Sequence, residues 1–355
     1  MGDKRKVLFF TPPSCGGAER MTVFIAKMLP RNLFDVTIVI VGMDMGDICK
    51  FIPSDYNIKL IRLKKIWHGG FFKIWNTIRI EKPDIVFSSL LYLNTHIILS
   101  TIFFKTKVIV RNNISFDEIK NRTKAFFIRA TYKWADKVIV QQQEMYDEII
   151  SYTGISPEKV ITLHNPIDTE LIDEKAKAPS PYNKEDKSIK FVWTARVDRT
   201  KGQDILIKAF EIVHRAIPNS KLYLVGKYDR NDLFFQNLRQ YINDNKLTKC
   251  VFFTGFDDNP YKWVINADCF VMPSRKEGLP NSLIDAMYLG KPVVATICIP
   301  VVSRIVKDGY NGILVVPEDI KAMASAMQKA FHFKDFKMTY IHASKDDFIS
   351  IFRSI

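Results

Sequence analysis

The stretch PSRKEGLPNSLIDAMYLGKPVVAT, residues 273–296, decides the fold expected for this chain. It follows a short apolar run, Cys269–Met272, and ends on a second one, Val293–Ala295. Between the two runs lie a loop rich in Gly and Pro and a segment of helical character. A strand, a helix and a second strand in this order are typical of a βαβ unit, in which the two strands are parallel.

The helix in this stretch has clear expected ends. We expect Asn281 or Ser282 to cap its start, and Gly290 and Pro292 to close it. Its N-terminus would present N–H groups and the positive end of the helix dipole to a bound phosphate. The stretch therefore predicts an anion site where the loop meets the helix.

The same alternation of short apolar runs and helical stretches extends over most of the chain. This rhythm predicts two doubly wound α/β domains, each with a parallel sheet, and a cleft between them. The expected strands are 7–11, 36–41, 85–88, 108–111, 138–141 and 160–164 in the first half, and 190–194, 221–225, 251–254, 269–272, 293–295 and 313–315 in the second.

A polar stretch with two prolines, TELIDEKAKAPSPYNKEDKS, separates the two series of strands. Polar, Pro-containing segments of this kind are typical of domain boundaries. We expect an N-terminal domain over residues 1–170, a linker over 171–188, a C-terminal domain over 189–335, and a C-terminal helix over 336–355 that packs back towards the N-terminal domain.

Two carboxylates accompany the predicted anion site. Glu277 lies in the loop before the helix, and Asp285 follows eight residues later, about two helical turns on. Carboxylates next to a phosphate repel it unless they accept hydrogen bonds from a ligand with many hydroxyl groups. Sugar and ribose hydroxyls meet that requirement.

A second segment, TARVDRTKGQDILIKAF at residues 194–210, carries the cations that such a ligand needs. A strand ends here in a loop with Arg196, Arg199 and Lys201, before an amphipathic helix. Arginine can hold phosphate oxygens through two parallel hydrogen bonds, and lysine adds a point charge. Together these side chains can neutralise a leaving diphosphate without a metal ion.

In these residues the chain resembles the retaining, family-four (group 1) glycosyltransferases that build bacterial surface polysaccharides. That family carries a G-R-x-x-x-x-K-G loop and a Glu-x7-Glu signature, which stand here as ARVDRTKG and EGLPNSLID. The resemblance implies the GT-B fold, with two Rossmann-like domains facing a central cleft. The second acid is Asp285, one methylene shorter than the usual Glu.

The resemblance also assigns roles in the donor half. It implies that Arg196 and Lys201 hold the donor diphosphate, and that Glu277 contacts the transferred sugar; these three are the expected catalytic residues. It further implies a donor-binding role for Asp285, on the ribose, and for the backbone of Gly278, Leu279 and Pro280. The loop at Gly226 is expected to read the nucleobase or the sugar.

The first half contributes further expected contacts through the same resemblance. SCGGAERM places Gly16 and Gly17 between a strand and a helix, where a backbone can approach a phosphate or sugar closely. VRNNISF makes Arg111, Asn112 and Asn113 candidates for acceptor binding, although Asn also favours turns and caps. HNPID, residues 164–168, resembles the family's transition from the last strand to the linker.

The charge of the chain indicates an anionic partner. With 52 Lys and Arg against 38 Asp and Glu, the net charge is +14 and the pI is near 9.4. Nucleic acid, an anionic membrane or a phosphorylated substrate would each fit. The stretch 61–82 mixes basic residues with Trp and Phe, which suits a membrane interface, but also suits core aromatics with solvated charges outside. The chain shows no RNP signature for RNA binding.

Several classes of protein are not indicated. The start MGDKRKVLFFTPPS has too short an apolar run for a signal peptide, and the apolar stretch 90–104 is too short for a bilayer span. Five scattered cysteines fit a reduced cytoplasm. Neither a D-x-D motif nor His, Cys and acidic residues at ligand spacing predicts a metal, and we expect no cofactor.

These observations combine into one functional expectation. The chain is expected to move a sugar, with retention of anomeric configuration, from a nucleoside-diphosphate sugar, UDP-sugar favoured, to a hydroxyl of a polyprenyl-linked saccharide. It would act in lipopolysaccharide or capsule synthesis as a peripheral protein at the inner face of the plasma membrane. Two alternatives remain: a non-enzymatic protein that binds anionic lipid or RNA, and another GT-B enzyme such as a nucleotide-sugar epimerase.

Overall fold

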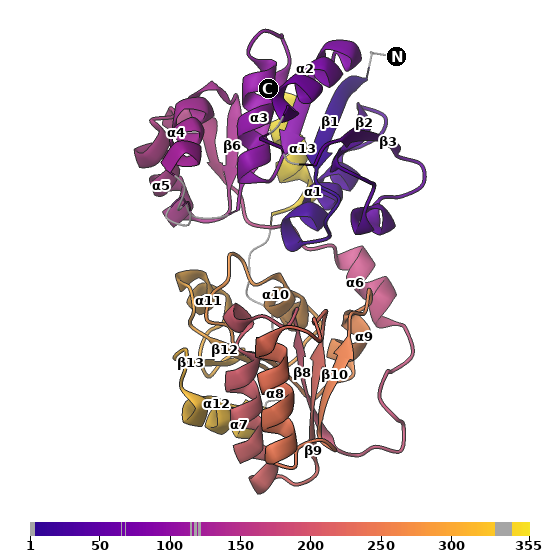
Figure 1. Ribbon diagram of the computed structural model, residues 1–355, viewed down its shortest axis with the longest axis vertical. Helices are drawn as coiled ribbons and strands as arrows, with labels where there is room; N and C mark the ends of the chain where they lie inside the picture. The colour runs from indigo at the N-terminus through magenta and orange to yellow at the C-terminus, as the bar shows by residue number, and fades with distance from the viewer. Residues whose placement is uncertain are drawn as a thin grey trace. The chain divides into compact units, whose positions relative to one another are not determined.

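The computed structural model describes residues 4–330 and 343–355, apart from positions 65, 68, 114, 115, 117, 118, 120 and 121. It divides into two compact units (Figure 1). Unit 1 comprises Met1–Ile167 and His342–Ile355, and unit 2 comprises Asp168–Ile341. The prediction of two doubly wound parallel-sheet domains is confirmed, because each unit is built around one parallel sheet with helices on both faces.

Unit 1 has a seven-stranded parallel sheet in the order β3-β2-β1-β4-β5-β6-β7. The order reverses between β1 and β4, as in a Rossmann sheet. The strands are β1 (Arg5–Thr11), β2 (Phe34–Gly42), β3 (Asn57–Arg62), β4 (Ile85–Ser88), β5 (Lys107–Asn112), β6 (Lys137–Val140) and β7 (Val160–Thr162).

Successive side chains along each strand point to opposite faces of the sheet, and on each face they join an apolar core. Helices therefore cover both faces. One core joins the sheet to α2 (Gly70–Glu81), α3 (Leu91–Thr101), α4 (Arg122–Thr131), η3 (Tyr132–Trp134) and α5 (Gln143–Thr153). The other core joins it to α1 (Gly17–Met28), η1 (Asp47–Phe51) and α13 (Lys345–Ser354). The short helix η4 (Pro157–Lys159) leads into β7.

The C-terminal helix α13 is part of unit 1. Phe352 is fully buried and lies among the rings of Phe9, Phe34 and Phe87, with centroids 5.6, 6.3 and 5.8 Å away. Arg5 donates hydrogen bonds to the carbonyls of Phe352, at 2.7 Å, and Ile355, at 2.8 Å. A cation at this position also suits the negative end of the helix dipole. The last helix is therefore anchored to the first strand by both apolar and polar contacts.

Unit 2 has a six-stranded parallel sheet in the order β10-β9-β8-β11-β12-β13. Its order reverses between β8 and β11. The strands are β8 (Ile189–Thr194), β9 (Ser220–Val225), β10 (Val251–Gly255), β11 (Cys269–Met272), β12 (Val293–Thr296) and β13 (Ile313–Val315). The helices are α6 (Thr169–Ala176), η5 (Arg199–Lys201), α7 (Gln203–Ala216), α8 (Leu233–Asp244), α9 (Tyr261–Ile265), α10 (Asn281–Tyr288), α11 (Pro300–Ile305) and α12 (Ile320–Ala330).

All twelve predicted strands are confirmed, with ends that shift by no more than two residues. Three local details differ from expectation. The edge strand β3 was missed, and α6 occupies the first part of the stretch expected to be a linker. The predicted side-chain cap of α10 was wrong, because Pro280 holds the cap position and no side chain caps the helix. None of the described helices is long and apolar enough to cross a bilayer.

Candidate active site

The candidate site in unit 2 forms where the loops after β8 and β11 meet. These two strands are hydrogen-bonded parallel neighbours, and the strand order reverses between them. In open α/β sheets, ligands bind outside the carboxyl ends of the strands at such a reversal. The loop after β8 carries Arg196 and Lys201, and the loop after β11 carries Glu277. The topology thus brings the predicted catalytic residues of two separate motifs to one edge of the sheet.

Lys201 and Glu277 form an ion pair at this edge. The Lys201 ammonium lies 2.7 Å from Glu277 Oε2, across 76 residues of sequence. The Glu277 side chain is 8% exposed and that of Lys201 is 22% exposed. A buried carboxylate is costly unless it is paired and hydrogen-bonded, so this contact both neutralises Glu277 and fixes its direction.

The second oxygen of Glu277 also has a partner. Ser274 Oγ donates a hydrogen bond of 2.7 Å to Glu277 Oε1. The backbone carbonyl of Ser274 accepts from the Thr296 hydroxyl at the end of β12. Ser274 and Thr296 are both fully buried. The carboxylate is therefore held from two strands rather than by its own loop alone.

Glycines allow the two loops to approach each other. Gly202 has φ +71°, and a Cβ there would lie 2.1 Å from the carbonyl oxygen of Pro273. No other residue fits this position without moving backbone, because the clash is with a main-chain atom and L side chains disfavour the left-handed region. The glycine of the K-G motif thus permits the contact between the loop of Lys201 and the loop of Glu277.

Gly226, at the end of β9, is placed in the same way. A Cβ there would lie 2.0 Å from the carbonyl oxygen of Ala195 and 3.0 Å from the backbone nitrogen of Arg196. The predicted donor-binding residue therefore lies directly against the backbone of the Arg196 loop. Because glycine has no side chain, the backbone at Gly226 can lie directly against the backbone of the Arg196 loop.

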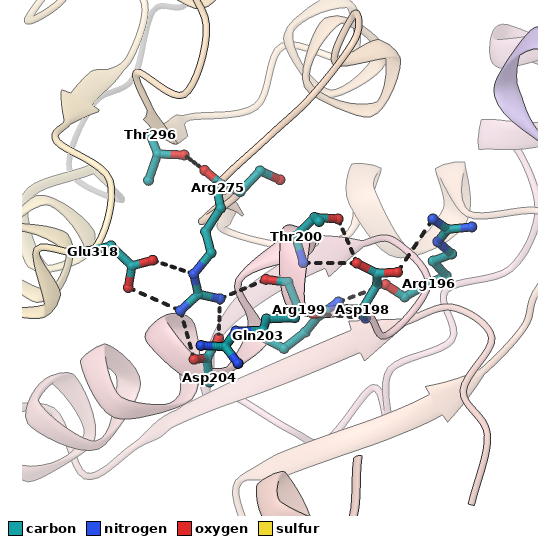
Figure 2. A network of polar contacts seen from close by, with 10 residues as sticks. Arg196, Asp198, Arg199, Thr200, Gln203, Asp204, Arg275, Thr296 and Glu318 are labelled. Carbon is teal, nitrogen blue, oxygen red and sulfur yellow. Dashed lines mark hydrogen bonds and ion pairs between the residues drawn. The ribbon is translucent and has the colours of Figure 1, made fainter. Parts of the chain in front are cut away.

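Arg275 ties the two loops together, as Figure 2 shows, and sequence reasoning did not single it out. Its Nη1 and Nη2 atoms donate to Asp204 Oδ1 and Oδ2 at 2.7 and 2.8 Å, and Nη1 also donates to the carbonyl of Arg199 at 2.7 Å. On its other side it pairs with Glu318, at 3.0 Å for Nη2 and Oε2. The bidentate fork fixes the residue two positions before Glu277 against the start of α7.

The electrostatics of this clamp follow from its geometry. The hydrogen bonds to Asp204 and then to Glu318 raise the pKa of Arg275 above its ordinary value. Burial raises the pKa of the Asp204 carboxyl, but the hydrogen bond and charge of Arg275 outweigh burial, so its pKa lies below the ordinary value. Each partner thus stabilises the charged form of the other.

Arg196 is held differently from Lys201. Its side chain is 70% exposed and pairs with Asp198 at 3.4 Å, while its backbone carbonyl accepts a 2.9 Å hydrogen bond from the buried Gln203 side chain. Figure 2 shows the guanidinium extending beyond Asp198. The structure therefore fixes the backbone at Arg196 and leaves the charged group on the surface, where an exposed ion pair holds it weakly.

The remaining donor residues cluster at the start of α10. Gly278 is exposed, Leu279 is half-buried and Pro280 is buried just before the helix, while Asp285 lies half-buried on the helix itself. No side chain caps this N-terminus, and the positive end of the helix dipole lies next to the loop of Glu277. This arrangement suits an anionic group next to the Lys201–Glu277 pair.

The expected glycine pair of unit 1 lies where α1 begins, directly after β1. Gly16 is the extended residue before the helix and Gly17 is its first residue. Ser14 Oγ donates a 2.6 Å hydrogen bond to Glu19 Oε1, which closes the loop over these glycines. Both glycines are exposed.

The three candidate acceptor residues end β5, and the structure separates them. Arg111 and Asn112 are 1% and 0% exposed, and the Arg111 guanidinium donates to Asn165 Oδ1 of the HNPID segment. Asn94 Nδ2 donates to the Arg111 carbonyl at 3.0 Å. Asn113 lines a cavity whose lining does not include Arg111 or Asn112. Arg111 and Asn112 therefore brace the end of β5, and their role towards an acceptor stays a prediction.

The cavity that Asn113 lines was not predicted from the sequence. It has a volume of about 580 Å³ and lies wholly in unit 1, at the carboxyl ends of β1 to β5. Its walls are mostly apolar. In the part of the chain that the structure describes, no group of three or more His, Cys, Asp and Glu residues could hold a metal ion.

Comparison with known proteins places both units in one class of enzymes. Residues 15–171 match the family model described as "Glycosyltransferase Family 4", and residues 188–332 match "Glycosyl transferases group 1". Together these matches cover most of the chain.

Two curated relatives share part of the sequence. An uncharacterized glycosyltransferase of Methanocaldococcus jannaschii is 33% identical over 242 residues, which is 64% of this chain and 59% of that protein. The N-acetylgalactosamine-N,N'-diacetylbacillosaminyl-diphospho-undecaprenol 4-alpha-N-acetylgalactosaminyltransferase of Campylobacter jejuni is 26% identical over 251 residues, 71% of this chain and 64% of that protein. The chain thus spans less than two thirds of each of these relatives.

A solved structure shares the fold over nearly the whole chain. The crystal structure of Anabaena HepE in complex with UDP and glucose superimposes with a TM-score of 0.75 at 19% identity, over 92% of this chain and 90% of that one. With the two family matches and the Lys201–Glu277 site, this similarity identifies the chain as a member of the group 1, family 4 glycosyltransferases, with the GT-B fold.

Proposed function

We propose that this glycosyltransferase uses a nucleoside-diphosphate sugar, UDP-sugar favoured, and transfers the sugar to a hydroxyl of a polyprenyl-linked saccharide with retention of anomeric configuration. The observation that carries the proposal is the Lys201–Glu277 pair at the strand reversal of unit 2. It sets a cation and a carboxylate side by side, which matches a ligand that is a phosphate at one end and a polyol at the other. The UDP bound by HepE supports the choice of base.

The chemistry needs charge stabilisation at both ends of the bond that breaks. As the anomeric bond lengthens, positive charge develops on the sugar ring and negative charge on the departing diphosphate. Lys201, Arg196 and the N-terminus of α10 would stabilise the diphosphate, while Glu277 accepts hydrogen bonds from sugar hydroxyls. We infer that these cations replace a metal ion and that the protein needs no cofactor.

Retention requires the acceptor hydroxyl to attack the face that the leaving group vacates. In that geometry the departing diphosphate oxygen lies close to the attacking hydroxyl and can take its proton. The site therefore needs no separate general base. Glu277 is already held by Lys201 and Ser274, which suits a fixed electrostatic role better than a proton-transfer role.

A lipid-linked acceptor and an anionic membrane are the partners that we propose, without nucleic acid. The Campylobacter relative's name describes a diphospho-undecaprenol acceptor. Unit 1 exposes large aromatic side chains beside its basic ones, all on elements that cover one face of its sheet or directly follow them: Phe72 is 71% exposed, Phe103 81%, Phe126 67% and Trp134 48%. Exposed aromatics with Lys and Arg are typical of surfaces that bind anionic lipid.

A transfer assay tests this proposal. The protein is incubated with UDP-, GDP- and ADP-sugars and with a polyprenyl-diphosphate-linked disaccharide, in the presence of EDTA, and the product linkage is read by NMR. We expect one UDP-sugar to be consumed. The new linkage in the product should have the same anomeric configuration as the sugar had in the donor. Interconversion of the donor without an acceptor would instead indicate an epimerase, and binding of lipid or RNA without turnover would indicate a non-enzymatic protein.

A further inference from the structure

The cavity of about 580 Å³ in unit 1 is placed where a second ligand is expected. It opens between Pro12 and Pro13, which follow β1, and Leu90 to Leu93, which follow β4. Because the strand order of unit 1 reverses between β1 and β4, the cavity lies at the topological switch point of its sheet. Unit 2 carries the Lys201–Glu277 site at the corresponding reversal. The two sheets therefore each present one candidate site at the equivalent place.

The chemistry of the cavity differs from that of the donor site. Its side chains are predominantly apolar, with Val41, Met43, Leu63, Ile66 and Leu91 among them, and its polar side-chain groups are those of Asp44, Lys64 and Asn113 and the hydroxyl of Tyr92. A saccharide would leave most of its hydroxyl groups without partners on such walls, which is costly. A hydrocarbon chain loses nothing there, and the volume is that of an ordinary small-molecule pocket.

The shape of the cavity depends on a close backbone approach. Gly42 lines it at the end of β2, and a Cβ at that position would lie 2.5 Å from Pro13 Cγ. Any larger residue would push the Pro13 wall inward or outward. The two prolines also restrict the loop after β1, since their φ angles are fixed. The wall formed by Gly42 and the two prolines is therefore fixed in shape.

A path of aromatic rings leads from the cavity to the protein surface. Tyr92 lines the cavity, and the ring of Trp67 lies 6.1 Å from it. Trp67 lies 6.1 Å from Phe127, which lies 6.0 Å from Phe126. Phe127 is 40% exposed and Phe126 is 67% exposed. Apolar contact is therefore continuous from inside the cavity to one of the exposed aromatic residues proposed to meet the membrane.

We propose that this cavity binds the isoprenoid chain of the lipid-linked acceptor next to its diphosphate. The inference rests on the proposed function, because it assigns a place to one part of the proposed acceptor. The aromatic path carries the chain in from the bilayer, the apolar walls take the units nearest the head group, and Lys64, an exposed cation of the lining, meets the diphosphate. The saccharide then projects beyond the cavity.

Calorimetry with a chain-length series tests the assignment. The probes are farnesyl diphosphate, isopentenyl diphosphate and inorganic diphosphate, added to the full chain without donor and below the critical micelle concentration. We expect farnesyl diphosphate to bind at least about tenfold more tightly than the two shorter probes, because only it fills the apolar walls. Equal affinity for all three would overturn the proposal, since binding would then depend on the diphosphate alone.

Two matched variants locate the binding. Met43 is 51% exposed at the cavity, so Met43→Glu puts a charge on the lining without disturbing the core. Leu233, 68% exposed on α8 of unit 2, supplies Leu233→Glu as the control. We expect Met43→Glu to weaken farnesyl diphosphate binding about tenfold or more and Leu233→Glu to leave it unchanged. Equal effects of Met43→Glu and Leu233→Glu on farnesyl diphosphate binding would contradict binding of the acceptor chain in this cavity. Tighter binding of a lysophosphatidic acid of similar chain length than of farnesyl diphosphate would contradict it as well.

The cavity assignment and the transfer reaction can fail separately. Transfer is measured with two acceptors that carry the same saccharide diphosphate on a C5 or a C15 chain. We expect a lower KM for the longer chain in the natural protein and a smaller difference in Met43→Glu. Equal KM values with normal turnover would overturn the cavity proposal and leave the transferase intact, whereas chain binding without any transfer would support the cavity and contradict the proposed acceptor.

Discussion

At the scale of single residues, the account depends on a carboxylate that is charged, nearly buried and held at both oxygens. Glu277 accepts from Lys201 and from Ser274, so its direction is set before any ligand arrives. Such preorganisation is what makes a fixed charge effective at a developing transition-state charge. The residue is therefore expected to affect turnover more than folding.

Glu277→Gln is expected to lower kcat by about 100-fold or more, since an amide keeps the shape and loses the charge. Binding of UDP alone should change little, because we assign Glu277 to the sugar end of the donor. Steady-state kinetics and calorimetry measure the two effects. Glu185→Gln, in an exposed loop of the same unit, is the matched control. A Glu277→Gln enzyme with normal kcat would remove Glu277 from the site.

Arg275→Ala is expected to lower stability by about 1 to 2 kcal/mol and to weaken donor binding, because it frees the loop of Glu277 from Asp204. Arg275→Lys should restore little, since lysine cannot form the bidentate contact. Urea unfolding and UDP-sugar titration provide the readouts. An unchanged KM in a destabilised Arg275→Ala protein would make the clamp purely structural.

The ion pair of Arg275 and Asp204 makes the stability of the protein depend on pH. Because the pKa of Asp204 is lowered in the folded state, its pairing stabilises the protein above the ordinary carboxyl pKa of about 4 and is lost as the pH falls through the lowered value. The stability difference between the natural protein and Arg275→Ala should therefore be largest at neutral pH and shrink below about pH 4. Denaturant unfolding at pH 7 and pH 3.5 compares them. A difference that grows on acidification would contradict the assigned sign.

How far the sequence predicts these residues depends on whether their partners are local. Lys201 and Glu277 lie in motifs whose spacing along the chain carries the signal. Arg275 lies 71 residues from Asp204 and 43 from Glu318, so no local pattern could reveal its contacts. The only hint of its role in the sequence is its place two positions before Glu277, the acid of the motif. The burial of Arg111 and Asn112 was likewise invisible, because it depends on neighbouring strands and on Asn165.

At the scale of elements, twelve strands were predictable from the sequence and the edge strand β3 was not. Central strands read as continuous apolar runs because both faces are covered. β3, Asn57–Arg62, mixes polar and apolar residues at the edge of its sheet, with Asn57, Lys59 and Arg62 exposed, so its pattern lacked that signal. The start of α10 was predicted one or two residues late because Asn281 and Ser282 suit a cap, but Pro280 takes that position.

The packing of α13 against unit 1 yields a stability prediction. Phe352→Ala removes a fully buried ring from among Phe9, Phe34 and Phe87, and should cost about 3 to 5 kcal/mol. Phe256→Ala, at a phenylalanine that is 61% exposed, should cost less than about 0.5 kcal/mol. Urea unfolding followed by circular dichroism compares the two variants. Similar small costs would show that α13 does not complete the core of unit 1.

At the scale of the whole molecule, the excess positive charge and the exposed aromatic residues point to the same partner. The sequence predicted this from composition alone, and it left open whether the aromatics were core residues. Within the stretch 61–82 the structure divides them: Trp75 is partly buried against Phe104, whereas Phe72 is exposed. Phe103 and Phe126, outside that stretch, are exposed as well. The cavity of unit 1 was beyond sequence reasoning, because its walls come from five separate segments.

Vesicle binding tests this surface. The protein should co-sediment with phosphatidylglycerol vesicles more than with phosphatidylcholine vesicles, and the bound fraction should fall as salt rises from 50 to about 500 mM, because salt screens the attraction. Replacing Phe103 and Phe126 together by Ser should reduce binding severalfold, while Phe256→Ser should not. Equal binding to both lipids, unaffected by salt, would contradict an electrostatic contact with the membrane.

The central claim is that unit 2 holds the donor diphosphate through Lys201 at the reversal between β8 and β11. Calorimetric titration of UDP, GDP and ADP, with and without EDTA, into the natural protein and into Lys201→Ala tests it most directly, with Lys262→Ala as a matched variant in the same unit. The account predicts that UDP binds regardless of EDTA, and that Lys201→Ala weakens it about tenfold or more while Lys262→Ala does not. Failure of all three nucleotides to bind, or equal UDP affinity in Lys201→Ala, would contradict it.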